Sequence, residues 1–210
     1  MCLAERHATA HQFVGEVGRD ERGLPRLCLR QISGGNVHGT RVWIAPEMQR
    51  RHPAFVLAPQ LPDPEQWSAP ESDEPARYAA LVVQLIERLL RDHAIDPDRV
   101  YLTGQSRGGR GTWDLATKRP DLFAAAAPVC GEGTPSRADA LRHMPVWAFH
   151  GADDPVIPVT GSREMVDALR AIGAPVRYTE YPGVGHNVWT RAYLEPELPE
   201  WLFARRRGHH

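Results

Sequence analysis

The first group in the sequence that could do chemistry is a serine between two glycines. Residues 104–108 read Gly-Gln-Ser-Arg-Gly, with Ser106 at the centre. The motif follows a short apolar run at residues 100–103 and precedes a stretch with helical spacing at residues 108–118. This context is typical of a sharp strand-to-helix turn that lifts a serine hydroxyl above the edge of a sheet. An ordinary glycine-rich turn remains the alternative, because small residues suit both.

A nucleophilic serine needs a general base, and the base needs a carboxylate that orients it. Asp153 and Asp154 directly follow the apolar run at residues 146–149, and His186 lies in a glycine-rich loop after the run at residues 176–181. Loops at the carboxyl ends of parallel strands meet at one edge of the sheet, so we expect these groups to converge on the serine. The order Ser, Asp, His therefore favours a catalytic triad over a plain turn.

The elements that would position these groups alternate along the chain. Apolar runs of strand length are expected at residues 55–58, 100–103, 123–129, 146–149 and 176–181, and helices at residues 74–90, 108–118 and 162–172 and through Trp201. Asp73 is expected to cap the first of these helices. This alternation predicts an α/β fold with a mostly parallel central sheet and helices on both faces. We expect a single domain over residues 1–210, in which residues 1–33 are atypical and show only one strand-like piece, Leu27-Cys28-Leu29.

Composition narrows the classes of function. The 210 residues are 42% hydrophobic and 24% charged, with a formal net charge of −1, so no basic field favours nucleic acid. No window of eighteen apolar residues predicts a membrane span. The three cysteines, Cys2, Cys28 and Cys130, are odd in number and lack a CxxC spacing, which indicates neither disulfides nor a thiolate zinc site. We expect a cytoplasmic protein without a metal or organic cofactor, in which Cys130 is a buried structural thiol rather than a site residue.

Several stretches of the sequence resemble the small, lidless α/β-hydrolases of the phospholipase/carboxylesterase and predicted-peptidase type. They read TGQSRGG at 103–109, GTWDL at 111–115, HGADDPVIP at 150–158 and YPGVGHNVW at 181–189, and FVLAPQ at 55–60 followed by Trp67 is also similar. The resemblance runs from about Gly34 to Arg207. It implies an α/β-hydrolase fold without a lid domain, with Ser106 as nucleophile and His186 as base. The family pattern HGxxDxxVP places the acid at Asp154 rather than Asp153.

One segment departs from that family. Its members usually carry an HGxG stretch at the end of the first core strand, and the backbone there supplies half of the oxyanion hole. Here residues 27–36 read LCLRQISGGN, without a His-Gly pair. The backbone N–H of Arg107, next to the nucleophile, is expected to be one donor to the oxyanion, and the second donor is unassigned.

Two tryptophans could border a substrate pocket. Trp67 follows the apolar run at 55–58, and Trp189 is three residues after His186, so both could reach the triad. Core packing is an equal alternative for each. Only about twenty residues lie between the apolar run near Val129 and the loop of Asp154, too few for a helical lid. This favours short acyl chains, because an uncovered methylene loses most of the ~0.8 kcal/mol that burial provides.

The residues and the resemblance together predict a serine carboxylesterase that hydrolyses short-chain acyl esters through an acyl-enzyme intermediate. The expected partner is a small-molecule ester, and the oligomeric state is not specified by the sequence. The alternative enzymatic activity is that of a serine hydrolase that acts on small peptides or acyl-peptides. The altered segment at residues 27–33 motivates an alternative of another class, a catalytically silent binding protein with the same fold.

Overall fold

The computed structural model describes the backbone of residues 26–33, 38–62 and 64–208, and within these ranges the side chains from residue 40 onward. The predicted atypical segment at residues 1–33 therefore lies outside the described residues up to residue 25. The glycine pair at 34–35, which follows the stretch that departs from the family pattern, also lies outside them.

Strands and helices alternate along most of the chain. The strands are β1 (Arg26–Ser33), β2 (Ala54–Leu57), β3 (Gln60–Leu61), β4 (Val100–Gln105), β5 (Ala125–Val129), β6 (Val146–Gly151) and β7 (Val176–Tyr181). The α-helices are α1 (His38–Ile44), α2 (Pro46–Arg51), α3 (Arg77–Asp92), α4 (Arg107–Lys118), α5 (Thr160–Ala171), α6 (Trp189–Tyr193) and α7 (Glu197–Phe203). Two 3₁₀ helices, η1 (Pro135–Leu141) and η2 (His186–Val188), complete the order.

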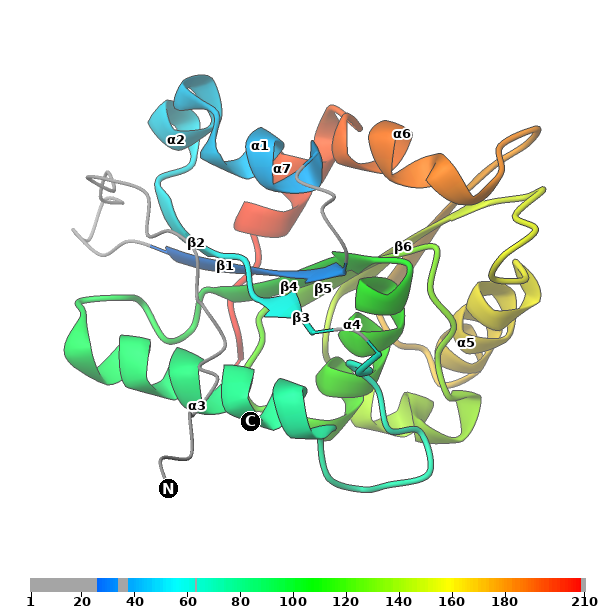
Figure 1. The fold of residues 1–210 in the computed structure, drawn as a ribbon, viewed down its shortest axis with the longest axis horizontal. Helices are drawn as coiled ribbons and strands as arrows, with labels where there is room; N and C mark the ends of the chain where they lie inside the picture. The colour runs from blue at the N-terminus through cyan, green and yellow to red at the C-terminus, as the bar shows by residue number, and fades with distance from the viewer. Residues whose placement is uncertain (1–25, 34–37, 63, 209–210) are drawn as a thin grey trace, which may run out of the picture.

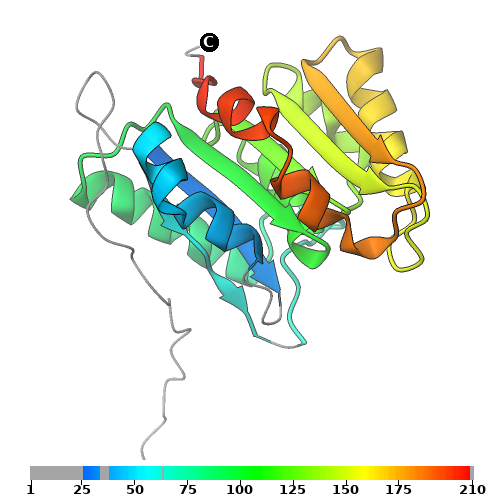
Figure 2. The same ribbon diagram turned by 90° about the horizontal axis from the view of Figure 1, so that it is seen from above.

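The strands form one parallel sheet in the order β2-β1-β4-β5-β6-β7, with β3 paired to the end of β1. Helices α3, α4 and α5 cover one face, and α1, α2, α6 and α7 cover the other, as Figures 1 and 2 show. The predicted α/β fold with a parallel sheet and helices on both faces is confirmed. None of the described helices is long and apolar enough to cross a membrane.

Two apolar clusters fill the space between the sheet and its helices. Neighbouring residues of one strand enter different clusters: Leu102 packs in the cluster that includes α3, and Tyr101 in the cluster that includes α7. Trp147 and Ala148 of β6 divide in the same way. Successive side chains of a strand point to opposite faces, so burial on both faces requires the near-continuous apolar runs that the sequence shows.

The first helix of the predicted set begins later than expected. The sequence predicts a start at residues 73–75 with Asp73 as the cap, whereas α3 begins at Arg77. The backbone N–H of Glu74 donates to the hydroxyl of Ser72 at 3.0 Å, so these residues form a turn of their own. The predicted cap is therefore wrong because a local side-chain bond competes with the first helical turn.

The sequence also did not predict the full extent of β1, or helices α1 and α2. β1 extends over eight residues and lies between β2 and β4, where its partners are residues 54–57 and 100–104. Its apolar residues are interrupted by Arg30 and Gln31, which hides the strand from a search for apolar runs. Pairing with residues far along the chain, rather than local pattern, identifies this strand.

A buried ion pair holds the loop after β3 against α4. The Nζ of Lys118 lies 2.9 Å from the carboxylate of Asp114 and donates to the carbonyl of Ala69 at 2.7 Å. Asp114 also accepts the backbone N–H of Ala69 at 3.2 Å. The side chains of Lys118 and Asp114 are 0% and 5% exposed, so each charge depends on the other for stabilisation. The pair therefore fixes the loop to the helix that follows the serine.

Substitution of Lys118 by Met should lower the free energy of unfolding by about 3–5 kcal/mol, because it leaves the Asp114 carboxylate buried without its cation. The exposed pair of Arg88 and Asp92 on α3 is the matched control. Substitution of Arg88 by Met should cost at most about 1 kcal/mol. Urea unfolding of the two variants measures both values, and equal losses would contradict the role given to the buried pair.

Candidate active site

Ser106 occupies a sharp turn between β4 and α4. Its backbone adopts φ 55° and ψ −121°, an uncommon conformation for a residue other than glycine. A Cβ atom on Gly104 would lie 2.3 Å from the carbonyl oxygen of Gly108, so the turn closes only with a small residue at position 104. The backbone N–H of Ser106 donates to the carbonyl of Val129 at 3.0 Å and holds the turn against β5. The sequence therefore folds locally to present the serine at the carboxyl end of β4.

Three predicted site residues meet at this end of the sheet. His186 follows β7 in η2, and its Nε2 lies 2.8 Å from the Oγ of Ser106. The other ring nitrogen, Nδ1, lies 2.7 Å from the Oδ2 of Asp154, in the loop after β6. A carboxylate only accepts, so Nδ1 carries the hydrogen and Nε2 can accept the serine proton. The His186 side chain is 18% exposed, which leaves it accessible to a reactant.

Asp154 is held by donors on both carboxylate oxygens. Its side chain is fully covered, and Oδ1 accepts the backbone N–H groups of Val156 at 2.8 Å and Ile157 at 3.0 Å. Burial opposes ionisation of this carboxyl, but the hydrogen bonds from His186 and from the two backbone groups outweigh it and lower the pKa of Asp154. Its neighbour Asp153 is exposed. The structure thus brings Asp154, and not Asp153, to the histidine.

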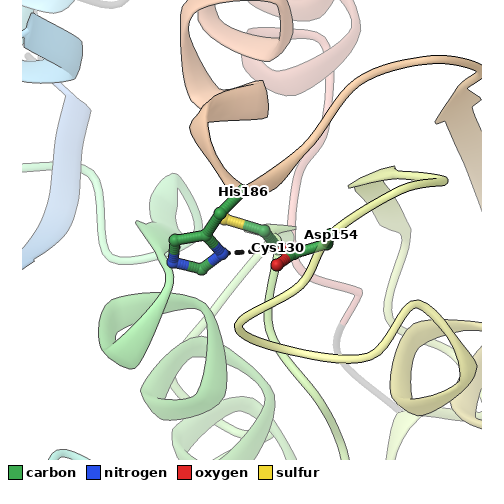
Figure 3. A group of neighbouring side chains, drawn as sticks. All are labelled: Cys130, Asp154 and His186. Atoms are coloured by element: carbon green, nitrogen blue, oxygen red, sulfur yellow. Dashed lines mark hydrogen bonds and ion pairs between the residues drawn. The ribbon is translucent and has the colours of Figure 1, made fainter.

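Cys130 lies beside the histidine and the aspartate, as Figure 3 shows. Its Sγ, a carboxylate oxygen of Asp154 and a ring nitrogen of His186 all lie within 4.8 Å of one another. In the described part of the chain this is the one cluster of three potential metal ligands. Its donors suit a metal poorly, because His186 and Asp154 are hydrogen-bonded to each other and burial raises the pKa of Cys130 to about 12. The cysteine is buried, as predicted, and it also borders the site.

The oxyanion donors are only partly defined. Arg107 is the first residue of α4, directly after Ser106, and backbone N–H groups at the start of a helix favour an anion. The second donor would come from the end of β1. The described backbone of β1 ends at Ser33 beside β3, and residues 34–37 lie outside the description. The second donor remains unassigned.

The two tryptophans have different places in the structure. Trp67 is 1% exposed and packs in the core cluster with α3 and α4, so the core alternative holds for it rather than the pocket assignment. Trp189 is partly buried at the start of α6, and its ring lies 5.5 Å from that of His186 at an angle of 88°. Trp189 therefore borders the histidine, as the pocket assignment requires.

Sequence reasoning gave no role to one further neighbour of the site, His150. It is fully buried at the end of β6, and its Nε2 lies 3.3 Å from the Oδ2 of Asp154. The sequence contained a signal for this contact, because the histidine stands four residues before the aspartate in the stretch HGADD. In the family resemblance this pattern marks only the acid.

Comparison with known proteins supports one family. The model of the dienelactone hydrolase family matches residues 46–193. The acyl-protein thioesterase 1 of Gibberella zeae is 28% identical over 122 residues, which are 51% of this chain and 52% of that protein. The feruloyl esterase C described as probable in Aspergillus niger is 24% identical over 183 residues, 85% of this chain and 64% of that protein.

Solved structures support the same fold. A thermostable esterase superposes with a TM-score of 0.82 at 38% identity, and the match covers 91% of this chain and 58% of that chain. The acylaminoacyl peptidase of Pyrococcus horikoshii has a TM-score of 0.68 at 14% identity, covering 92% and 39%, which shows the fold alone. The chain thus spans little more than half of the thioesterase and the thermostable esterase.

Cys130 should resist alkylation in the native protein, since its thiol is buried and its pKa is raised to about 12. We expect iodoacetamide at pH 8 to leave the peptide that contains Cys130 unmodified, and to modify it fully in 6 M guanidinium. Peptide mass spectrometry measures both. Rapid modification of Cys130 in the folded protein would contradict its buried position beside His186.

Proposed function

The chain belongs to the dienelactone hydrolase family of α/β-hydrolases, and we propose that it is a serine carboxylesterase that hydrolyses short-chain acyl esters. The observation that carries the proposal is the hydrogen-bonded series from Ser106 through His186 to Asp154, with contacts of 2.8 and 2.7 Å. These are the distances and the order of partners that nucleophilic catalysis by a serine requires.

The reaction would proceed in two halves. His186 takes the proton of Ser106 as Oγ attacks the acyl carbon, and the backbone N–H of Arg107 faces the oxygen that becomes negative. The imidazolium, stabilised by the Asp154 carboxylate, then gives its proton to the departing alcohol and leaves an acyl-enzyme. His186 next takes a proton from water, and the resulting hydroxide attacks the acyl carbon of the acyl-enzyme. The carboxylic acid product then departs as His186 returns the proton to Ser106.

Esters are preferred to amides as the substrate class. The relatives with significant sequence identity include a thioesterase and several esterases by name, whereas the peptidase in the comparison shares the fold alone. An alkoxide also departs more easily than an amine, so an ester needs less protonation of the leaving group by His186. A small-peptide hydrolase is therefore the second candidate within the enzymes.

A short acyl group is proposed because little of the described chain covers the site. Between β5 and β6 the structure has only the 3₁₀ helix η1, and its residues Ala138 and Leu141 pack into the core. No helix in this connection extends over the serine. Beyond the first few carbons an acyl chain would remain in water and would gain little from the ~0.8 kcal/mol that a buried methylene contributes.

Labelling by a fluorophosphonate tests whether the serine is a nucleophile at all. We expect one label per chain, located on Ser106 by peptide mass spectrometry, and no label on the Ser106→Ala variant. The probe reacts with an activated serine irrespective of the natural substrate. A folded wild-type protein that takes no label would favour the silent binding protein.

Substitutions in the triad should have graded effects. Replacement of Ser106 or His186 by Ala should lower kcat on the order of 10⁴-fold, because the members act as a unit, and Asp154→Asn should cost somewhat less. The adjacent Asp153→Asn is the matched control and should change kcat little, since that side chain is exposed. Steady-state hydrolysis of p-nitrophenyl acetate measures all four. A larger loss for Asp153→Asn than for Asp154→Asn would reassign the acid.

The acyl preference can be measured with p-nitrophenyl esters of increasing chain length. We expect kcat/KM to be highest from acetyl to butyryl and to be flat or falling from about C6, because no described element covers a longer chain. The leaving group is the same throughout, so only the acyl contacts vary. A maximum at C10 or longer would contradict the open site.

A further inference from the structure

A second histidine, His150, lies behind the carboxylate that holds His186. It is fully buried at the end of β6, and the reaction steps above make no use of it. Its Nε2 lies 3.0 Å from the carbonyl oxygen of Ile157 and 3.3 Å from the Oδ2 of Asp154. Its Nδ1 lies 2.7 Å from the Oγ of Ser162 on α5. Both nitrogens therefore have polar partners in a closed environment.

The partners determine where the hydrogen of His150 lies. The carbonyl of Ile157 and the carboxylate of Asp154 can only accept, so Nε2 must carry a hydrogen. Burial lowers the pKa of His150 despite the opposing effects of Ile157 and Asp154, which keeps the ring neutral. Nδ1 then has a lone pair that can accept the hydroxyl hydrogen of Ser162, for which the carbonyl oxygen of Gly131 is the other acceptor. His150 is thus a neutral donor directed at the acid loop, which is the loop after β6 that carries Asp154.

The Oδ2 of Asp154 is shared between two histidines. It accepts the Nδ1–H of His186 at 2.7 Å and faces the Nε2–H of His150 at 3.3 Å. The other oxygen, Oδ1, is fixed by the backbone N–H groups of Val156 and Ile157. The carboxylate therefore stays in place if His150 is removed, and the loss changes the charge that Oδ2 presents rather than its position.

Among the residues that the structure describes, the other titratable groups that face the two histidines are neutral or paired. Cys130, after β5, is a neutral thiol because burial raises its pKa to about 12. Glu180 on β7 is the register partner of His150, and it is bound by Arg163 at 2.6 Å and by the hydroxyl of Tyr178 at 2.8 Å. The carboxylate of Asp154 is thus the charged group that both histidines contact.

We propose that His150 is a positioning residue whose Nε2–H shares the Oδ2 of Asp154 with His186 and weakens the hold of the carboxylate on the His186 imidazolium. The inference rests on the proposed function. A donor to a carboxylate disperses its negative charge, so the charge available to a second partner falls. His186 therefore returns its proton to the departing alcohol more readily than it would without His150.

A purely structural role is the competing explanation. The carbonyl oxygen of Gly131 lies 2.8 Å from the Oγ of Ser162 and competes with Nδ1 of His150 for the single hydroxyl hydrogen, and a Cβ on Gly131 would lie 2.3 Å from the backbone of Gly109 in α4. His150 and Ser162 thus help to pack the acid loop against the helix that follows the serine. Loss of this packing would lower kcat at every pH, whereas loss of the shared donor would move the pH profile.

The pH dependence of kcat/KM for p-nitrophenyl acetate separates the two roles. In the His150→Leu variant the midpoint of the profile should move up by about half a pH unit or more. At pH values below the midpoint, kcat/KM as a fraction of its alkaline plateau should then be about threefold lower than in the wild-type protein. His150→Gln retains an N–H donor and should shift the midpoint less. Ser162→Ala is the matched control, because it disturbs the same cluster without removing the donor, and should leave the midpoint unchanged.

Two results would overturn the proposal. One is a lower kcat in His150→Leu at every pH with an unmoved midpoint, and the other is an equal shift in Ser162→Ala. A wild-type protein that hydrolyses no ester and takes no fluorophosphonate would instead refute the proposed function. Where the leucine variant does not fold, ¹⁵N NMR of the wild-type imidazoles decides: His150 should be neutral at pH 7, with its hydrogen on Nε2. Hydrogen on Nδ1 alone, or a charged ring at pH 7, would contradict the shared donor.

Discussion

Close contact between backbone segments at the carboxyl end of the sheet is the constraint on which the site depends. A Cβ atom on Gly109 would lie 2.3 Å from the carbonyl oxygen of Val129, and one on Gly151 would lie 2.3 Å from that of Val184. The first contact presses the helix of the serine onto β5, and the second presses the acid loop onto the loop of His186. Without side chains at these two positions, segments far apart in sequence approach closely enough for three functional groups to form direct hydrogen bonds.

This arrangement places polar and strained groups where a fold alone would avoid them. Ser106 and Cys130 both have positive φ, which is uncommon outside glycine, and Asp154 carries its charge in a covered position. The surrounding structure offsets these costs locally. Backbone N–H groups and His186 stabilise the carboxylate, and the Ser106 backbone is anchored to β5. Strain and buried charge at one edge of an otherwise apolar sheet are typical of a site selected for chemistry rather than stability.

Some features of this protein are visible in the local sequence, and others depend on contacts between residues far apart in the chain. The strands that precede Ser106 and Asp154 are buried on both faces, so their apolar runs identify them locally. The order Ser, Asp, His along the chain then indicates which residues form the triad. Only the piece Leu27-Cys28-Leu29 of β1 could be identified in this way, because the residues that pair with the strand and define its full extent lie in β2 and β4. Trp67 and Trp189 each follow a predicted strand, and only their tertiary contacts separate a core side chain from one that borders His186.

The altered segment at residues 27–33 bears on the rate of the reaction more than on its type. Loss of one oxyanion donor typically costs about 10²–10³ in kcat, whereas the triad itself contributes on the order of 10⁴ or more. A chain that relied on the Arg107 N–H alone would therefore be a slow esterase and still a serine nucleophile, because the hydrogen bonds of Ser106, His186 and Asp154 do not involve that segment. A weak rate would thus not distinguish an enzyme from a binding protein. The covalent reactivity of Ser106 does, since it depends on the activated hydroxyl and much less on a second donor.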